Sequence, residues 1–199
     1  MKMKNILIPL VTILLCAAVL FGLNYGLKHT KESNEAKNLT WYSQTLLPGS
    51  TEFTEEAYTG EDANIHRVFK AENGYVIETV TYGYAGEISM LIGVSNAGKV
   101  TGLVVTDQSE TLTLGAEALT DHAFLAQFLN TSGNVAIGTA GADAFSSATG
   151  TESDTEDSVY VDGISGATVT SKAIARSVNS AVAYVTGADA DSGATSWGG

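Results

Sequence analysis

Hydrophobic and polar positions divide the chain into one long apolar run and a larger region of short alternating segments. Residues 5–27 are 23 consecutive uncharged residues between Lys4 and Lys28. As a helix this run is roughly 35 Å long, which exceeds a hydrocarbon core of about 30 Å. We therefore expect a short N-terminus at 1–4, a transmembrane helix at 5–27 and a polar stalk at 28–38. A cleaved signal peptide and a lipoprotein anchor at Cys16 are the alternatives.

Four β-strands are expected in the middle of the chain, arranged as two pairs. Ile65–Ala71 and Tyr75–Tyr82 flank Asn73-Gly74, while Glu87–Val94 and Lys99–Thr106 flank the Asn-Ala-Gly of residues 96–98. Asn-Gly between alternating hydrophobic segments is a strong signal of a β-hairpin. The pattern therefore predicts an antiparallel sheet.

Helical periods and turn residues complete the expected domain. Helices are predicted at 39–47, at 120–130 with Thr120 as N-cap, and at 173–185, where apolar residues follow the helical period. A short strand is expected at 159–161, a long exposed loop at 139–158 and a disordered tail at 187–199. Strands mixed with a few helices, without alternation of strand and helix, indicate an α+β domain at 39–186.

Charge and cysteine content exclude several classes of function. The net charge is −12, and residues 38–199 hold 20 acids against five Lys or Arg. A body this acidic repels phosphate backbones, which excludes nucleic-acid binding. One Cys and three widely spaced His rule out a disulfide framework or a Cys-ligated cluster, and no metal site is expected.

Residues 162–171 carry the chemistry of most interest. Gly163 and Gly166 allow close approach of a ligand, and hydroxyl groups lie just ahead of the last predicted helix. The N-terminus of a helix favours phosphate, and Lys172 and Arg176 lie in its first turns. A simpler reading is that Thr170 or Ser171 caps the helix while the glycines form a turn. The residues alone leave both readings open.

Asp-x-x-Ser-Gly-Ala-Thr at 162–168 resembles the flavinylation motif of the FMN-binding-domain family. The resemblance implies that a flavin transferase attaches FMN to Thr168 through a phosphoester. The recognition sequence would be Asp162, Ser165, Gly166 and Ala167, and Thr170 and Lys172 would bind the cofactor beside it.

The resemblance extends to residues 46–49, 83–105 and the closing helix. The family commonly has Glu-Thr-Pro-Gly-Leu-Gly where residues 110–115 read Glu-Thr-Leu-Thr-Leu-Gly. It implies that Glu110, Thr111, Leu114 and Gly115 line the flavin. Because this chain lacks the Pro-Gly pair, the resemblance does not predict the backbone conformation of this loop. The alternative is that the loop only connects a strand to a helix.

With its N-terminal apolar segment, the chain most resembles the G subunits of Rnf-type ion-translocating oxidoreductase complexes. The C subunit of the sodium-pumping NADH:quinone reductase is built on the same plan. The resemblance implies an electron carrier in a ferredoxin:NAD oxidoreductase complex of the cell membrane, with its FMN domain on the extracytoplasmic side. Other membrane subunits would be its partners, and no separate substrate-converting site is expected.

Two other functions remain open on the sequence: a stand-alone membrane-anchored flavoprotein and a non-redox surface module. A second Asp-x-x-Ser-Gly-Ala-Thr occurs at 189–195, followed by only four residues. Because no helix can follow it, we expect a coincidence in a tail rich in small residues. The coupling ion, sodium or proton, is not encoded in any residue pattern of this chain.

Overall fold

The computed structural model describes residues 15–16, 21, 39–112, 114–138 and 159–187. The chain divides into two units, Met1–Trp41 and Tyr42–Gly199, and the elements from β1 onward belong to the second. Within the described ranges no helix is both long and apolar enough to cross a membrane. Apart from residues 15, 16, 21 and 187, the segments expected at 1–4, 5–27, 28–38, 139–158 and 187–199 lie outside the described residues.

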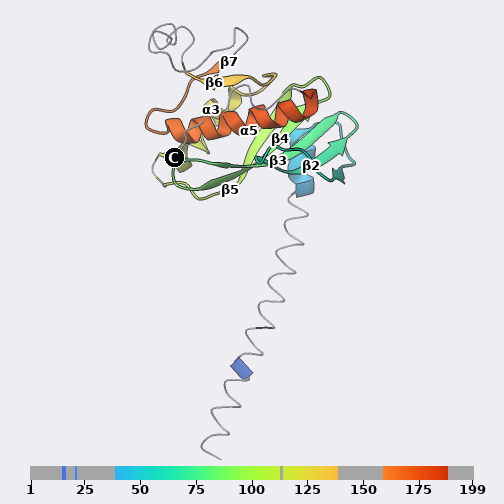
Figure 1. Ribbon diagram of the computed structural model, residues 1–199, viewed down its shortest axis with the longest axis horizontal. Helices are drawn as coiled ribbons and strands as arrows, with labels where there is room; N and C mark the ends of the chain where they lie inside the picture. The colour runs from blue at the N-terminus through green and yellow to red at the C-terminus, as the bar shows by residue number, and fades with distance from the viewer. Residues whose placement is uncertain (1–14, 17–20, 22–38, 113, 139–158, 188–199) are drawn as a thin grey trace, which may run out of the picture. The chain divides into compact units, whose positions relative to one another are not determined.

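A five-stranded sheet forms the centre of the second unit, in the order β1-β2-β3-β4-β5 (Figure 1). Every neighbouring pair is antiparallel. The expected antiparallel sheet and the α+β class are therefore confirmed, and four of the strands begin and end within two residues of their predicted bounds. The strands are β1 (Thr54–Glu56), β2 (Ile65–Ala71), β3 (Gly74–Tyr82), β4 (Glu87–Ser95) and β5 (Val100–Gln108).

The two hairpin turns lie side by side at one end of the sheet. Gly98 has φ +72° and donates its N–H to the carbonyl of Ser95 at 2.8 Å. The side chain of Asn96 reaches the carbonyl of Glu72 in the first turn at 2.9 Å, and its N–H bonds the carbonyl of Asn73 at 3.1 Å. Because the second turn satisfies backbone groups of the first, the register of β2 to β5 is fixed at this end.

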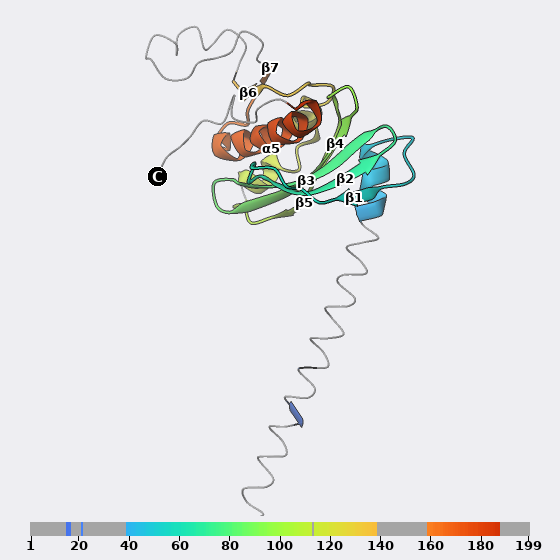
Figure 2. The same cartoon turned by 45° about the vertical axis from the view of Figure 1, so that its right-hand side comes forward.

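Helix α5 (Thr168–Thr186) lies across one face of the sheet, and the main core is buried between them (Figures 1 and 2). Ile77, Ile92, Ile174 and Val178 are fully buried there. Polar groups in this layer are paired as burial requires: the hydroxyls of Thr81 and Ser177 are 2.9 Å apart.

The opposite face of the sheet is covered at one end by the last turn of a helix at 39–46, as the sequence predicted. Leu46 and Leu47 are buried. The strands below them carry paired glycines, Gly93 on β4 opposite Gly102 on β5. A Cβ at Gly93 would lie 2.5 Å from the carbonyl oxygen of Leu46, and that oxygen accepts a hydrogen bond from the hydroxyl of Thr101. Glycine is therefore needed where this backbone crosses the sheet.

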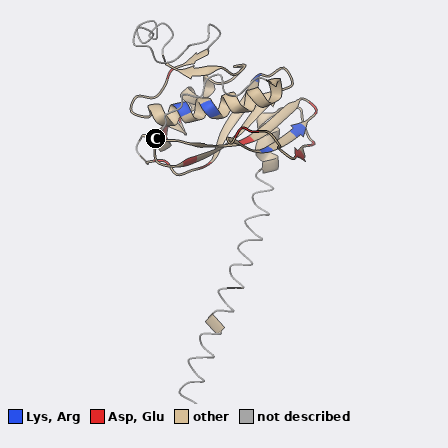
Figure 3. Cartoon of the chain, in the orientation of Figure 1, with Lys and Arg blue, Asp and Glu red and all other residues tan. Residues whose placement is uncertain are grey.

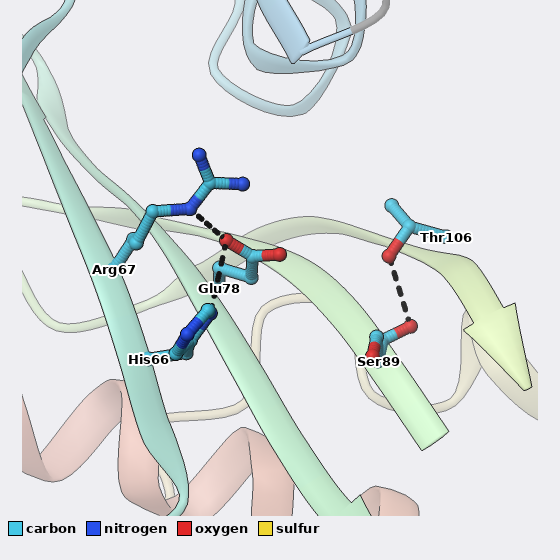
Figure 4. Close-up of polar contacts among 5 residues, drawn as sticks. All are labelled: His66, Arg67, Glu78, Ser89 and Thr106. Atoms are coloured by element: carbon cyan, nitrogen blue, oxygen red, sulfur yellow. Dashed lines mark hydrogen bonds and ion pairs between the residues drawn. The ribbon is translucent and has the colours of Figure 1, made fainter. Parts of the chain in front are cut away.

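The same face is polar where β2 and β3 run beyond this cover (Figure 4). Glu78 accepts a hydrogen bond from Nε of Arg67, and its Oε2 lies 3.7 Å from Nδ1 of His66. The hydroxyl of Thr106 donates to the carbonyl of Ser89 at 3.1 Å. These are satisfied surface contacts between neighbouring strands.

The helix expected at 120–130 is shorter than predicted and has a different cap. Helix α3 spans His122–Ala126, and the carboxylate of Asp121 accepts the N–H groups of Ala123 at 2.8 Å and Phe124 at 3.1 Å. The prediction of Thr120 as cap was wrong. The hydroxyl of Thr120 instead donates to carbonyl groups of the preceding helix α2 (Gly115–Ala118).

Three described elements carry no clear sequence signal: β1, α2 and β6 (Val135–Ile137). Strand β6 pairs with β7 (Val159–Val161), whose position was predicted, in a small parallel sheet. The side chain of Asn179 on α5 bonds both backbone groups of Val135, at 2.9 and 3.0 Å. These two hydrogen bonds attach the second sheet to the middle of α5.

Candidate functional site

Thr168 is the first residue of α5, and its side chain is exposed. The helix begins five residues before the predicted start at 173, so the alternative in which Thr170 or Ser171 caps it is wrong. Ala167 occupies the N-cap position, and among the described residues no side chain caps this end. The first N–H groups of a helix have no acceptors within it. The end of α5 at Thr168 therefore retains free donors and the positive end of its dipole.

The loop before Thr168 is held by the helix that follows it. The N–H of Ala167 bonds the carbonyl of Ile164 at 2.9 Å, which closes a turn with Gly166 at φ +84°. The hydroxyl of Ser171 accepts the N–H of Ile164 at 3.3 Å and donates to the carbonyl of Ala167 at 2.9 Å. Glycine suits the left-handed position of the turn, because other residues adopt it at a cost.

A second attachment joins this loop to the segment that follows α3. The amide side chain of Gln127 accepts the N–H of Asp162 at 3.0 Å and approaches its carbonyl at 3.4 Å. The side chains of Asp162, Ser165 and Thr168 are exposed. No sequence signal had singled out Gln127, because a single Gln outside a motif carries no pattern.

The segment after β5 lies against the same loop. A Cβ at Gly166 would be 3.4 Å from a terminal methyl carbon of Leu114, so the two expected motifs are neighbours in space although 52 positions separate these residues. Thr111 and Leu112 are exposed, Leu112 by 89%. Glu110 is only 8% exposed. The structure thus brings together the two segments that resemblance alone had linked.

The turn between β3 and β4, residues 83–86, is the third segment at this end of the sheet. Nη2 of Arg176 on α5 donates to the carbonyl of Tyr82 at 2.9 Å, and Oε1 of Glu110 accepts the N–H of Ala85 at 3.3 Å. Tyr82 and Tyr84 are exposed. The Tyr82 hydroxyl donates to Glu87 at 2.6 Å, and this hydrogen bond raises the pKa of Tyr82.

The charges on α5 itself favour an anion at its start. The helix contains Lys172 and Arg176 and neither Asp nor Glu, as the charge colouring of Figure 3 shows. Lys172 is half-buried in the second turn. A phosphate on the hydroxyl of Thr168 would lie at a helix N-terminus with cations on the same helix.

Two predicted site residues occupy different surroundings from Thr168. Thr170 is fully buried, and its hydroxyl has no hydrogen-bond partner among the described residues. Gly115 begins α2 and is also buried. No group of His, Cys, Asp and Glu that could hold a metal ion occurs within the described part of the chain.

Comparisons with known proteins point to one family. The model of the FMN-binding domain matches residues 83–183. The G subunit of the Na(+)-translocating ferredoxin:NAD(+) oxidoreductase complex of Acetobacterium woodii is 28% identical over 200 residues, covering 91% of this chain and 89% of that protein. The G subunit of the Proton-translocating ferredoxin:NAD(+) oxidoreductase complex of Clostridium ljungdahlii is 33% identical over 112 residues, covering 56% and 53%.

A solved structure also aligns with the chain. The crystal structure of the C subunit of the Na(+)-translocating NADH-quinone reductase from Parabacteroides distasonis covers 64% of this chain and 64% of its own, at 24% identity and a TM-score of 0.44.

Proposed function

The chain belongs to the FMN-binding-domain family, and from this premise we propose that it is the electron-carrier G subunit of an ion-translocating ferredoxin:NAD oxidoreductase complex. Bound FMN would supply the transfer of one or two electrons. The protein residues hold the cofactor in place and set its surroundings. The Acetobacterium woodii relative, which is named the G subunit of such a complex, covers 91% of this chain, and this supports the proposal.

Within this function, Thr168 carries the FMN through a phosphoester. The observation behind this assignment is the exposed hydroxyl at the first position of an uncapped 19-residue helix, inside Asp-x-x-Ser-Gly-Ala-Thr. Free N–H groups and the helix dipole would stabilise the phosphate, and Lys172 would add a positive charge on the same helix. Asp162, Ser165 and Gly166 are exposed, so a flavin transferase can reach them. Ala167 is buried and supports the turn.

The remaining predicted site residues differ in how exposed they are. Thr111 and Leu114 are exposed beside the attachment loop and are proposed to contact the isoalloxazine ring. Thr170, fully buried two residues after Thr168, is proposed to act through the packing of the first turn of α5. Glu110 and Gly115 are buried and reach the cofactor less directly.

Residues 5–27 are proposed to anchor the FMN-binding domain at 39–186 to the cell membrane on its extracytoplasmic side. Covalent attachment suits that location, since a dissociated flavin would be lost there. The other membrane subunits of the complex are its proposed partners. Their co-purification with the full-length chain in mild detergent supports this arrangement, whereas a solitary redox-active protein favours a stand-alone flavoprotein.

Flavin fluorescence in a denaturing gel tests the attachment site. Thr168→Ala should abolish the fluorescent band, because no other hydroxyl of that motif lies at a helix start. The matched control is Thr186→Ala, an exposed Thr at the other end of α5, which should keep the band. A band that persists in Thr168→Ala and disappears in Thr195→Ala would overturn the assignment in favour of the second motif.

A further inference from the structure

Glu110 is a buried carboxylate enclosed by two segments at the proposed flavin site. It lies between the end of β5 and the start of α2, and only 8% of its surface is exposed. A Cβ at Gly83 would overlap its Oε1, and a Cβ at Gly115 would overlap its Oε2. Glycines on two different segments therefore leave room for one carboxylate. A residue so enclosed affects the site mainly through the backbone around it.

The hydrogen bonds of Glu110 join these segments. Oε1 accepts the N–H of Ala85, in the middle of the turn between β3 and β4. The N–H of Glu110 itself donates to the side chain of Gln108 at 2.6 Å, which fixes the start of the loop. Oε2 is buried without a hydrogen-bond partner among the described residues. A buried side-chain oxygen without a partner costs solvation and calls for an explanation.

The contacts continue from Glu110 to the attachment site. On one side, the turn held through Ala85 carries the exposed Tyr84. On the other side, Gly115 is preceded in the chain by Leu114, whose methyl groups lie against Gly166, two residues before Thr168. Glu110 thus lies between the turn with Tyr84 and the loop that presents Thr168. This contact is in addition to the hydrogen bond from Arg176 of α5 to the carbonyl of Tyr82.

We infer that Glu110 is a positioning residue, whose carboxylate joins the β3–β4 turn to the loop at 110–115 and so fixes Tyr84 and Leu114 beside the flavin. This inference rests on the proposed function, because the surface that Glu110 positions is the one that the flavin would occupy. It differs from the direct cofactor contact that family resemblance implies for this residue. In the structure the carboxylate faces Gly83, Ala85 and Gly115.

Amide hydrogen exchange in the flavin-free, full-length chain tests the link without the cofactor. Glu110→Ala should accelerate exchange in the turn at 83–86 by about tenfold, because the hydrogen bond from the N–H of Ala85 to Oε1 is lost. Glu110→Gln keeps the shape and an acceptor for Ala85 and should retain most of the protection. Glu117→Ala, which removes an exposed carboxylate on α2, is the matched control and should leave this turn unchanged.

Gly83→Ala displaces the carboxylate without removing it. It should accelerate amide exchange in the turn at 83–86 as Glu110→Ala does. The double variant Gly83→Ala with Glu110→Ala should exchange little faster than either single variant, because both changes act on one contact. Additive effects, or an unchanged turn in Glu110→Ala, would overturn the positioning role.

The flavin-loaded chain provides the second measurement. Glu110→Ala should keep the fluorescent gel band but weaken the visible circular dichroism of the flavin, with Glu110→Gln close to the unmodified protein. If Glu110→Gln weakens this signal as much as Glu110→Ala, the carboxylate contacts the flavin directly and positioning is overturned. Absence of flavin from the unmodified chain would instead overturn the proposed function and leave the exchange result standing.

Discussion

The crossing of Leu46 over the sheet predicts an unequal response of two paired glycines. Gly93 and Gly102 face each other across β4 and β5, and both lie under Leu46. A Cβ at Gly93 would meet the carbonyl oxygen of Leu46 at 2.5 Å and the hydroxyl of Thr101 at 2.6 Å. A Cβ at Gly102 would first meet a terminal methyl of Leu46, at 2.9 Å. Backbone cannot move aside as readily as the end of a side chain.

The expected magnitudes follow from three terms. Overpacking costs about 1–3 kcal/mol, and loss of the hydrogen bond from Thr101 to Leu46 adds roughly 0.5–1.5 kcal/mol. Replacing a glycine at an ordinary backbone conformation returns about 0.4–1 kcal/mol through the unfolded chain. Together these terms lower the free energy of unfolding of Gly93→Ala by about 0.5–4 kcal/mol, with a central value of about 2 kcal/mol. Gly102→Ala should cost less than about 1 kcal/mol, because the side chain of Leu46 adjusts.

Thermal unfolding of the full-length chain in mild detergent, followed by circular dichroism, measures the difference. For a domain of this size Gly93→Ala should lower the melting temperature by roughly 4–10 °C. Thr101→Val removes only the hydrogen bond to the carbonyl of Leu46 and should lower the melting temperature by less than Gly93→Ala does. Equal shifts for the two glycine variants would refute the reasoning, because they would show that the Leu46 carbonyl does not constrain β4.

Three further outcomes follow from single contacts. Asp121→Ala removes the acceptor for two N–H groups at the start of α3 and should lower the free energy of unfolding by about 1 kcal/mol in urea titrations, with Asp121→Asn close to the unmodified chain. Ser177→Ala leaves the buried hydroxyl of Thr81 with one weaker partner and should cost about 0.5–1.5 kcal/mol. Burial raises the pKa of Tyr184 above its ordinary 10.0, so the folded state favours the neutral phenol. The contribution of Tyr184 to the free energy of unfolding is complete below about pH 10 and is lost as the pH rises through the raised pKa. Tyr184→Phe should therefore lose less stability at alkaline pH than the unmodified chain, as measured by urea titrations.

The hairpins were predictable because their signals are local. Asn-Gly and Asn-Ala-Gly predicted the turns, and the alternation of hydrophobic and polar residues beside them predicted the strands. Strand β1, Thr-Glu-Glu, has no such pattern and is mostly exposed. It forms because β2 offers an edge, and Glu56 lies 3.3 Å from the ammonium of Lys70 on that strand. Elements of three or four residues depend on tertiary partners, which a period cannot reveal.

The start of α5 was predicted too late for a physical reason. The apolar period begins at Ala173, while the first turn contains the β-branched Thr168, Val169 and Thr170 and follows an Ala rather than a capping residue. Propensity and capping rules both argue against a helix there. Tertiary contacts override them: Thr170 and Ser171 are buried, and Ser171 bonds back to the preceding loop.

The geometry of the proposed attachment site could not be predicted from the motif alone, because it depends on contacts made in the fold. Three independent attachments hold the loop before Thr168: the amide of Gln127, the hydroxyl of Ser171 and the side chain of Leu114. Each comes from a different segment, and only Ser171 lies in the motif region. Ser171 is buried, whereas Gln127 and Leu114 are exposed, and the Thr168 side chain that the motif marks is exposed at the helix end. A residue in this setting keeps its position whether or not a phosphate is attached, so the cofactor would be oriented by the protein rather than by its own linkage.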